Sequence, residues 1–255
     1  MNLRFVGSAP VLRYLRELHL PAIRECFEDK ARQAERETLG YEQYLLELAE
    51  RECQERRAHR ITRLLQAYKL PLEKTIENFD MSRLPVKAGR QVKALLDGGF
   101  LDRRENVLAF GNPGSGKTHL LSALGQELIR KGRRVAFSTR VRLVQDLLRA
   151  MKELRLSRAI KKLAYYEALV LDDIGYVQQS REEMEVLFTL LAERYERGSV
   201  LITSNLPFSK WEVIFKDPMT TASAIDRLVH HSVILELNIG SYRMEQAKKK
   251  KAEDE

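Results

Sequence analysis

The sequence has little cysteine, little tryptophan and no long hydrophobic run. Its 255 residues include two cysteines, Cys26 and Cys53, and one tryptophan. The cysteines lack the spacing of metal ligands, so we interpret them as ordinary thiols of a reducing cytoplasm. No apolar run approaches the ~18 residues of a membrane helix, and the N-terminus has no apolar stretch of signal-peptide length. We therefore expect a cytoplasmic protein without a membrane segment.

Charge, in contrast, is abundant and unevenly placed. Charged residues make up 31% of the chain, with a net charge of +8, yet residues 1–80 hold fourteen basic and fourteen acidic residues. Residues 130–162 hold twelve Lys and Arg against Asp146 and Glu153. Such a cluster favours a nucleic-acid partner, because neutralised phosphates release counterions; a solvated helix face is the alternative. The predicted contacts are Arg133, Arg134, Arg140, Arg142, Arg149, Lys152, Arg155, Arg158, Lys161 and Lys162.

The first part of the chain has a helical pattern. Apolar residues recur three and four positions apart over residues 10–69, and Pro21 is well placed to begin a second helix. Residues 41–70 read as one long amphipathic helix that ends at Pro71. Residues 72–85 have no clear periodicity and are predicted to be a linker. We predict a small all-helical N-terminal domain over residues 1–72, a second domain over residues 73–245 and a charged, disordered tail over residues 246–255.

After the linker, strands and helices alternate. Short apolar runs predict strands at 106–110, 134–138, 168–172, 199–204 and 232–237. Helices are predicted over 117–130, from about 141, and over 181–197. This alternation is typical of an α/β domain with a parallel sheet covered on both faces and right-handed crossovers.

A phosphate-binding motif follows the first predicted strand. "AFGNPGSGKTHL" matches G-x-x-x-x-G-K-[ST] from Gly111 to Thr118 and opens a predicted helix, the context that separates the motif from a chance glycine-rich loop. The glycines let the backbone curl so that N–H groups point inward, and the helix N-terminus adds positive potential. Lys117 would reach the β and γ phosphates of ATP. The predicted nucleotide contacts are Gly111, Asn112, Pro113, Gly114, Ser115, Gly116, Lys117, Thr118 and His119.

Two adjacent acids, Asp172 and Asp173, end the strand at 168–172. Carboxylates at the end of a buried strand are costly unless something compensates them. In P-loop proteins Mg²⁺ is held by the loop hydroxyl and by an Asp on a neighbouring strand, so Thr118 and Asp172 are the predicted metal ligands. Asp173 then stands where it can orient or deprotonate the attacking water; a cap on the next turn is the alternative. Asn205, after the fourth strand, could hold that water or be a turn residue.

Four segments together carry a family resemblance. "GNPGSGKTHL", "LVLDDIGY", "LLAERYERGSVLITSNLPFSKW" and "DRLVHHSVILELNIGSYR" resemble the IstB-type helper ATPases of bacterial insertion sequences, over about residues 10–245. These proteins belong to the AAA+ class and are relatives of the DnaC/DnaI helicase loaders. The resemblance implies a five-stranded AAA+ P-loop core flanked by helices, behind a helical N-terminal domain. It also implies homo-oligomers with ATP at subunit interfaces, sequence-tolerant remodelling of duplex DNA, and recruitment and stimulation of the element's transposase.

The resemblance also assigns roles to polar residues of the C-terminal part. Asn205 resembles the sensor-one group, Arg227 resembles an arginine finger that serves a neighbouring subunit's ATP, and Arg243 resembles a second sensor that contacts the nucleotide. Read without the family, Arg227 would be half of a helix salt bridge. His230 and His231 have no metal-ligating partner nearby, so we expect them to pack or to cap a helix end.

The chain departs from the family pattern at one position. The family usually has Asp-Glu at the end of the third strand, and this chain has Asp172 and Asp173. A carboxylate one methylene shorter sits about 1 Å or more further from the water, and such a misplacement can cost around a hundredfold in rate. We therefore expect an ATPase with slow hydrolysis, in which ATP binding mainly supports assembly.

Two other functions compete with the transposition helper. A helicase loader would grip a replicative helicase and prefer single-stranded DNA, for which aromatic stacking platforms are typical; the basic segment has few aromatic residues. A small-molecule kinase would need an acceptor-binding lid that the sequence does not indicate.

Overall fold

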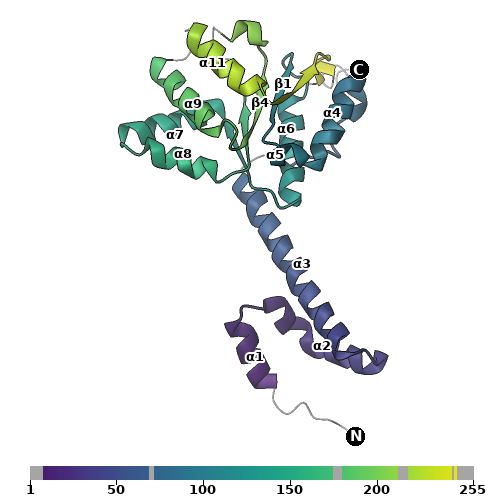
Figure 1. The fold of residues 1–255 in the computed structure, drawn as a ribbon. Helices are drawn as coiled ribbons and strands as arrows, with labels where there is room; N and C mark the ends of the chain where they lie inside the picture. Colours follow the sequence, from purple (N-terminus) through teal and green to yellow (C-terminus); the bar gives the residue numbers. More distant parts are fainter. Residues whose placement is uncertain (1–7, 69–71, 175–179, 212–217, 243, 246–255) are drawn as a thin grey trace, which may run out of the picture. The chain divides into compact units, whose positions relative to one another are not determined.

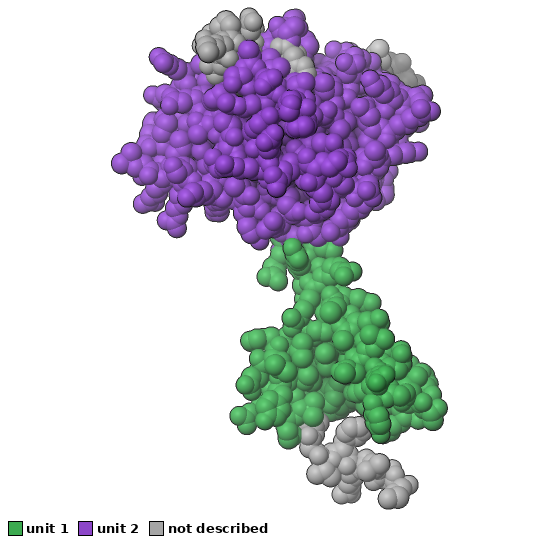
Figure 2. All heavy atoms as spheres, viewed as in Figure 1, with its two compact units in different colours: residues 1–63 green, residues 64–255 purple. Residues whose placement is uncertain are grey.

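The computed structural model describes residues 8–68, 72–174, 180–211, 218–242 and 244–245 (Figure 1). The chain divides into two compact units, residues 1–63 and 64–255, which Figure 2 draws in different colours. Arg243 and the predicted tail at 246–255 lie outside the described residues. Among the described residues, none of the helices combines the length and the hydrophobicity that a membrane span requires.

Unit 1 is helical, as predicted. Its helices are α1 (Ser8–Glu17), α2 (Pro21–Glu37) and α3 (Tyr41–Tyr68), whose last turn belongs to unit 2. Pro21 stands at the start of α2, and Leu20 before it supplies no side-chain cap. Instead the buried Glu52 of α3 accepts hydrogen bonds from the N–H groups of Ala22 and Ile23, at 2.9 and 3.1 Å. A carboxylate at a helix N-terminus also interacts favourably with the helix dipole.

Unit 2 is built on a five-stranded parallel sheet. Its strands are β1 (Asn106–Gly111), β2 (Val135–Thr139), β3 (Ala168–Asp172), β4 (Ser199–Ser204) and β5 (Ser232–Leu237). The order is β2-β3-β4-β1-β5, and every pair is parallel. All five predicted strands are confirmed to within a residue. Because β1 and β3 are not neighbours in this order, β4 lies between the motif strand and the acid-bearing strand.

Helices cover both faces of this sheet. They are α4 (Val86–Asp97), α5 (Gly99–Asp102), α6 (Lys117–Arg130), α7 (Arg140–Lys152), α8 (Leu156–Ala164), α9 (Arg181–Arg194) and α11 (Pro218–Val229), with short 3₁₀ turns at Met81–Arg83 and Phe208–Lys210. Strand residues alternate between the two faces. Leu108, Leu171 and Ile202 pack with α7, α8, α9 and α11 in one core. Helix α6 packs against the strands on the other side, and Figure 1 shows the two layers.

Two stretches differ from the sequence expectation. The basic region holds two helices, because the chain breaks at Leu154, whose φ of 55° is left-handed. Helices α4 and α5 lie in a stretch between the predicted linker and the first predicted strand, to which no element is assigned from the sequence. Helix α4 buries Ala88, Val92 and Leu95 and ends at Gly98, which has a φ of 88°.

Candidate functional site

The glycine-rich loop connects β1 to the N-terminus of α6. Gly114 and Gly116 have φ values of 80° and 91°, a region that favours glycine. A Cβ on Gly114 would lie 2.1 Å from Ser241 Oγ, so a side chain there would also displace the C-terminal segment. The first N–H groups of α6 have no partners within the helix, which makes this end of α6 suited to an anion.

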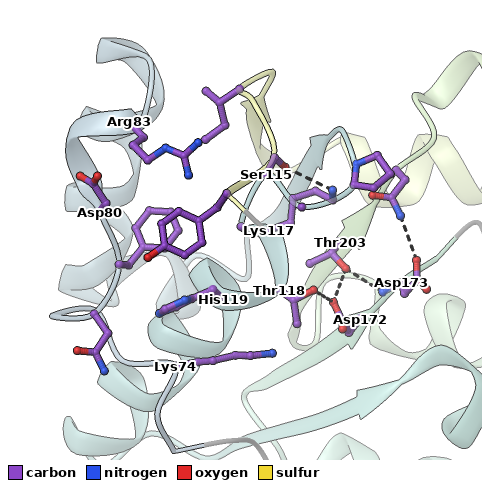
Figure 3. A pocket seen from close by; sticks show the side chains of 18 residues that line it. Lys74, Asp80, Arg83, Ser115, Lys117, Thr118, His119, Asp172, Asp173 and Thr203 are labelled. Atoms are coloured by element: carbon purple, nitrogen blue, oxygen red, sulfur yellow. Dashed lines mark hydrogen bonds between the residues drawn. The ribbon is translucent and has the colours of Figure 1, made fainter. Parts of the chain in front are cut away.

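A cavity of about 440 Å³ lies beside this loop (Figure 3). It is lined by loop residues and by polar residues that follow β3 and β4, and its other wall comes from the segments before α4 and after β5. The lining residues are Lys74, Asn78, Phe79, Asp80, Arg83, Pro113, Gly114, Ser115, Gly116, Lys117, Thr118, His119, Asp172, Asp173, Thr203, Asn205, Ile239 and Tyr242. The structure therefore brings the predicted loop residues from Pro113 to His119 together with both acids and Asn205.

Lys117 is held inside the loop. Its Nζ donates to the main-chain oxygens of Gly111 and Asn112, both at 2.8 Å, and the residue is only 6% exposed. These contacts place the ammonium where the β and γ phosphates of a nucleotide would lie in a loop of this type.

Asp172 is fixed by two hydroxyl groups. Thr118 Oγ1 and Thr203 Oγ1 both donate to Asp172 Oδ1, at 2.8 and 2.6 Å (Figure 3). This geometry joins the loop, β3 and β4 at one point. Carboxylate and hydroxyl oxygens are hard donors of the kind that Mg²⁺ prefers, so Thr118 and Asp172 fit the predicted metal ligands.

Asp173 lies one residue further on, in an unusual backbone conformation. Its φ is 64°, a left-handed region in which Asp and Asn are enriched among the non-glycine residues. Its N–H donates to Thr203 Oγ1 at 2.8 Å, and Asn205 Nδ2 donates to its Oδ1 at 3.3 Å. Partial burial and the charge of Asp172 raise the pKa of Asp173, and Arg140 offsets part of this effect. A base candidate and a polar group that could hold water therefore meet here.

The opposite wall of the cavity was not anticipated from the sequence. Phe79 packs edge-to-face on His119, with ring centroids 5.3 Å apart, and Arg83 lies 5.2 Å from the ring centroid of Tyr242. The segment before α4 is tied to α6, because His119 Nε2 lies 2.9 Å from the Thr75 oxygen. Aromatic and cationic groups at this end suit a nucleobase. No periodic pattern in the linker could have revealed them.

Comparison with known proteins identifies the family. The family described as IstB-like ATP binding protein matches residues 13–251. The chain belongs to this family. An insertion-sequence ATP-binding protein of Sinorhizobium fredii is 44% identical and covers 91% of this chain and 78% of the relative. Insertion-sequence ATP-binding proteins of Pseudomonas aeruginosa and Geobacillus stearothermophilus are 37% and 36% identical, over 87% and 91% of this chain and 84% and 92% of the relatives.

Solved structures support the AAA+ fold of this IstB-type protein. AMPPCP-bound DnaA from Aquifex aeolicus matches with a TM-score of 0.54 and 20% identity, over 73% of this chain and 56% of that one. The DnaC helicase loader matches with a TM-score of 0.54 and 20% identity, over 66% of this chain and 98% of that one. At this identity the likeness establishes the fold alone.

The basic residues of this IstB-type protein fall into different environments. Arg140 is 4% exposed, which contradicts its predicted DNA contact, because the first turn of α7 turns it inward near Asp173. Arg133 pairs with Asp102 and Glu167, and Arg134 also pairs with Glu167. The exposed members of the predicted set all lie on or beside α7 and α8: Arg142, Arg149, Lys152, Arg155, Arg158, Lys161 and Lys162.

Arg227 is not brought to the cavity of its own chain. Its guanidinium lies 4.7 Å from the ring centroid of Phe188, and its Nη1 is buried without a hydrogen-bond partner. Arg227 is thus not among the described residues that line the cavity with the acid pair.

Proposed function

We propose that this IstB-type protein is an ATP-dependent DNA-binding helper of transposition that hydrolyses ATP slowly. The observation that carries the proposal is the joining of Thr118, Asp172 and Asp173 beside the phosphate-binding loop. This arrangement suits a nucleoside triphosphate whose terminal phosphoryl group is transferred to water.

Each residue of the site has a distinct proposed task. Thr118 and Asp172 would hold Mg²⁺, which when bound neutralises charge on the β and γ phosphates. Lys117 binds the same phosphates, and Asp173 accepts a proton from the attacking water or orients it. Asn205 restrains Asp173 through its side-chain amide. These groups would support hydrolysis of ATP to ADP and phosphate.

We infer that ATP lies between subunits of a homo-oligomer. The support is the position of Arg227, which is not among the described residues lining its own cavity and has a buried nitrogen without a partner. An arginine supplied by a neighbouring subunit stabilises charge on the transferring phosphoryl group. Substitution of Arg227 by Ala should leave ATP binding by the single chain intact and reduce nucleotide-dependent assembly, which analytical ultracentrifugation measures.

We infer that the exposed basic residues of α7 and α8 bind the backbone of duplex DNA. Phosphate contacts bind without reading the sequence, so affinity should fall steeply with salt and differ little between unrelated duplexes. The test replaces Arg158, Lys161 and Lys162 together by Ala and measures affinity against salt concentration for two such duplexes. We expect the slope of log affinity against log salt to fall by about 0.9 for each DNA phosphate that the variant no longer neutralises.

Helix α4 offers a matched control for this experiment. Lys87, Arg90 and Lys93 are exposed on α4, and their replacement by Ala removes the same charge from another face. An equal loss of affinity in both variants, or a strong preference for one duplex, would contradict the proposed surface.

The insertion-sequence relatives support a transposase of the same element as the partner. A helicase loader is the second candidate, because the DnaC loader has a similar fold. Co-precipitation of the full chain with the transposase or with a replicative helicase, in the presence of ATP and DNA, separates the two functions. Retention of the helicase alone would overturn the transposition proposal.

A further inference from the structure

A second cluster of potential ligands lies outside the cavity. Glu196 follows α9, and His230 and His231 lie between α11 and β5. One potential ligand atom from each of the three lies within 4.8 Å of the other two, and all three residues are exposed. Sequence spacing alone indicates no metal-ligating partner for these histidines, because Glu196 reaches them only through the packing of α9 against α11.

The main chain around this cluster is held in place. Arg104 Nη1 donates to the main-chain oxygen of Glu196. The Asn106 N–H donates to the His231 oxygen at 2.7 Å. The His230 N–H donates to the Asp226 oxygen at 2.9 Å, in the last turn of α11. The cluster is therefore presented by two restrained segments, one at Glu196 and one at His230 and His231.

Tyr195 lies beside two members of the cluster. Its hydroxyl lies 3.2 Å from His230 Nδ1, and Tyr195 directly precedes Glu196 in the chain. This contact at Nδ1 restrains the orientation of the His230 ring. With Nδ1 in contact with the hydroxyl, Nε2 is the His230 nitrogen that would bind an ion, as in metal sites where a second partner fixes the ring.

We propose that Glu196, His230 and His231 form a binding site for a divalent transition-metal ion, with Zn²⁺ as the ion that fits best. Two imidazole nitrogens and one carboxylate oxygen are a donor set found in zinc sites with a fourth position open to water or to another ligand. Imidazole ligands disfavour the hard ions Mg²⁺ and Ca²⁺. The site is separate from the ATP cavity and does not depend on the proposed function.

An ion at this site would affect the two helices that the cluster adjoins, α9 and α11. An ion held here would join the end of α9 to the end of α11. These two helices also carry Phe188 and Arg227, which stack on each other. The ion would therefore restrict the helix pair that sets the position of Arg227.

The test is a Zn²⁺ titration of the metal-free full chain, without nucleotide, in competition with a chromophoric chelator. Because thiols bind zinc strongly, the parent protein carries Cys26→Ser and Cys53→Ser. We expect one ion per chain. His230→Ala and His231→Ala should each weaken binding by more than tenfold, and Tyr195→Phe by about tenfold, as loss of a ligand-orienting group typically does.

Two further variants make the result decisive. Glu196→Gln keeps the size of the side chain and should also weaken binding. The control His59→Ala removes an exposed histidine of unit 1 and should leave affinity unchanged. Circular dichroism verifies that each variant is folded. Equal Zn²⁺ affinity in the parent and in folded His231→Ala, or the absence of stoichiometric binding by the parent, would overturn the proposal.

Discussion

Units 1 and 2 each hold a carboxylate in place, but the pKa of the carboxylate is lowered in unit 1 and raised in unit 2. In unit 1, burial alone would raise the pKa of Glu52. Hydrogen bonds from Arg56 and from the N–H groups of Ile23 and Ala22 outweigh that effect and lower the pKa. The charge of Glu52 is therefore compensated within the chain, and its role is structural.

In unit 2 the effects that raise the pKa of the acid outweigh those that lower it. Partial burial and the negative charge of Asp172 raise the pKa of Asp173, and the positive charges of Arg140 and Lys117 offset this only in part. A carboxylate whose charge the fold leaves poorly compensated, in a cavity with a lysine, is typical of a functional site. The role of an acid that the fold holds in place therefore depends on what compensates its charge, whether the acid is buried like Glu52 or exposed to the cavity like Asp173.

The largest expected effect is the loss of hydrolysis in Asp173→Asn. The amide keeps the shape of the side chain but cannot accept a proton, so the hydrolysis rate should fall by about 10²–10⁴-fold. Thermal stability should stay the same or rise, because the change removes repulsion from Asp172. Single-turnover ATP hydrolysis and thermal melts measure the two effects.

Asp146→Asn is the matched control for that substitution. It removes the same charge from the exposed surface of α7 and should change neither hydrolysis nor stability. A clear loss of stability in Asp173→Asn would show that Asp173 resembles Glu52 after all, and would break the comparison.

The next largest effect is expected from Asp173→Glu. The extra methylene extends the carboxylate toward the water, so turnover should rise, by up to about a hundredfold. Stability should fall slightly, because glutamate adopts a left-handed φ such as 64° less readily than aspartate does. Unchanged or lower turnover would refute the idea that the shorter acid slows hydrolysis.

The sequence predicted the phosphate side of the site because its residues are linked by short-range patterns. A strand, a glycine-rich turn and a helix specify the loop from Gly111 to Thr118, and Asp172 ends an apolar strand. The order β2-β3-β4-β1-β5 then brings both acids and Asn205 to the loop. The strands, too, could be predicted, because their apolar runs are short and bounded by polar residues.

The parts of the site that the sequence did not predict depend on contacts between distant segments. Phe79 and Arg83 reach the cavity because an aperiodic segment packs across α6, and no local pattern encodes that packing. The basic run predicts a DNA contact for Arg140, but composition does not tell which side of a helix faces inward. Glu196 meets His230 only through tertiary packing.

Glu52→Ala should destabilise unit 1 by about 1–3 kcal/mol, because it leaves two helix N–H groups without their partner. Hydrogen exchange of the Ala22 and Ile23 amides in the full chain measures the change, and ATP binding should be unaffected. Glu50→Ala, an exposed change on the same helix, should alter stability by less than about 0.5 kcal/mol. Equal effects in the two variants would show that Glu52 does not cap α2.

The smallest expected effect is a change with pH in the stability that Glu52 contributes, which follows from its lowered pKa; the pKa of Asp173 is raised instead. Because the pKa of Glu52 is lowered in the folded protein, its ionised form stabilises unit 1 above the ordinary glutamate value of 4.5, and this contribution is lost as the pH falls through the lowered pKa. The stability difference between the wild type and Glu52→Gln should be about 1 kcal/mol at neutral pH and shrink in acid. Urea titrations that follow the Ala22 and Ile23 amide signals by NMR, at pH 7 and in steps below 4.5, measure this difference. A difference that stayed constant across this range would mean that the hydrogen bonds to Glu52 stabilise unit 1 without help from its charge.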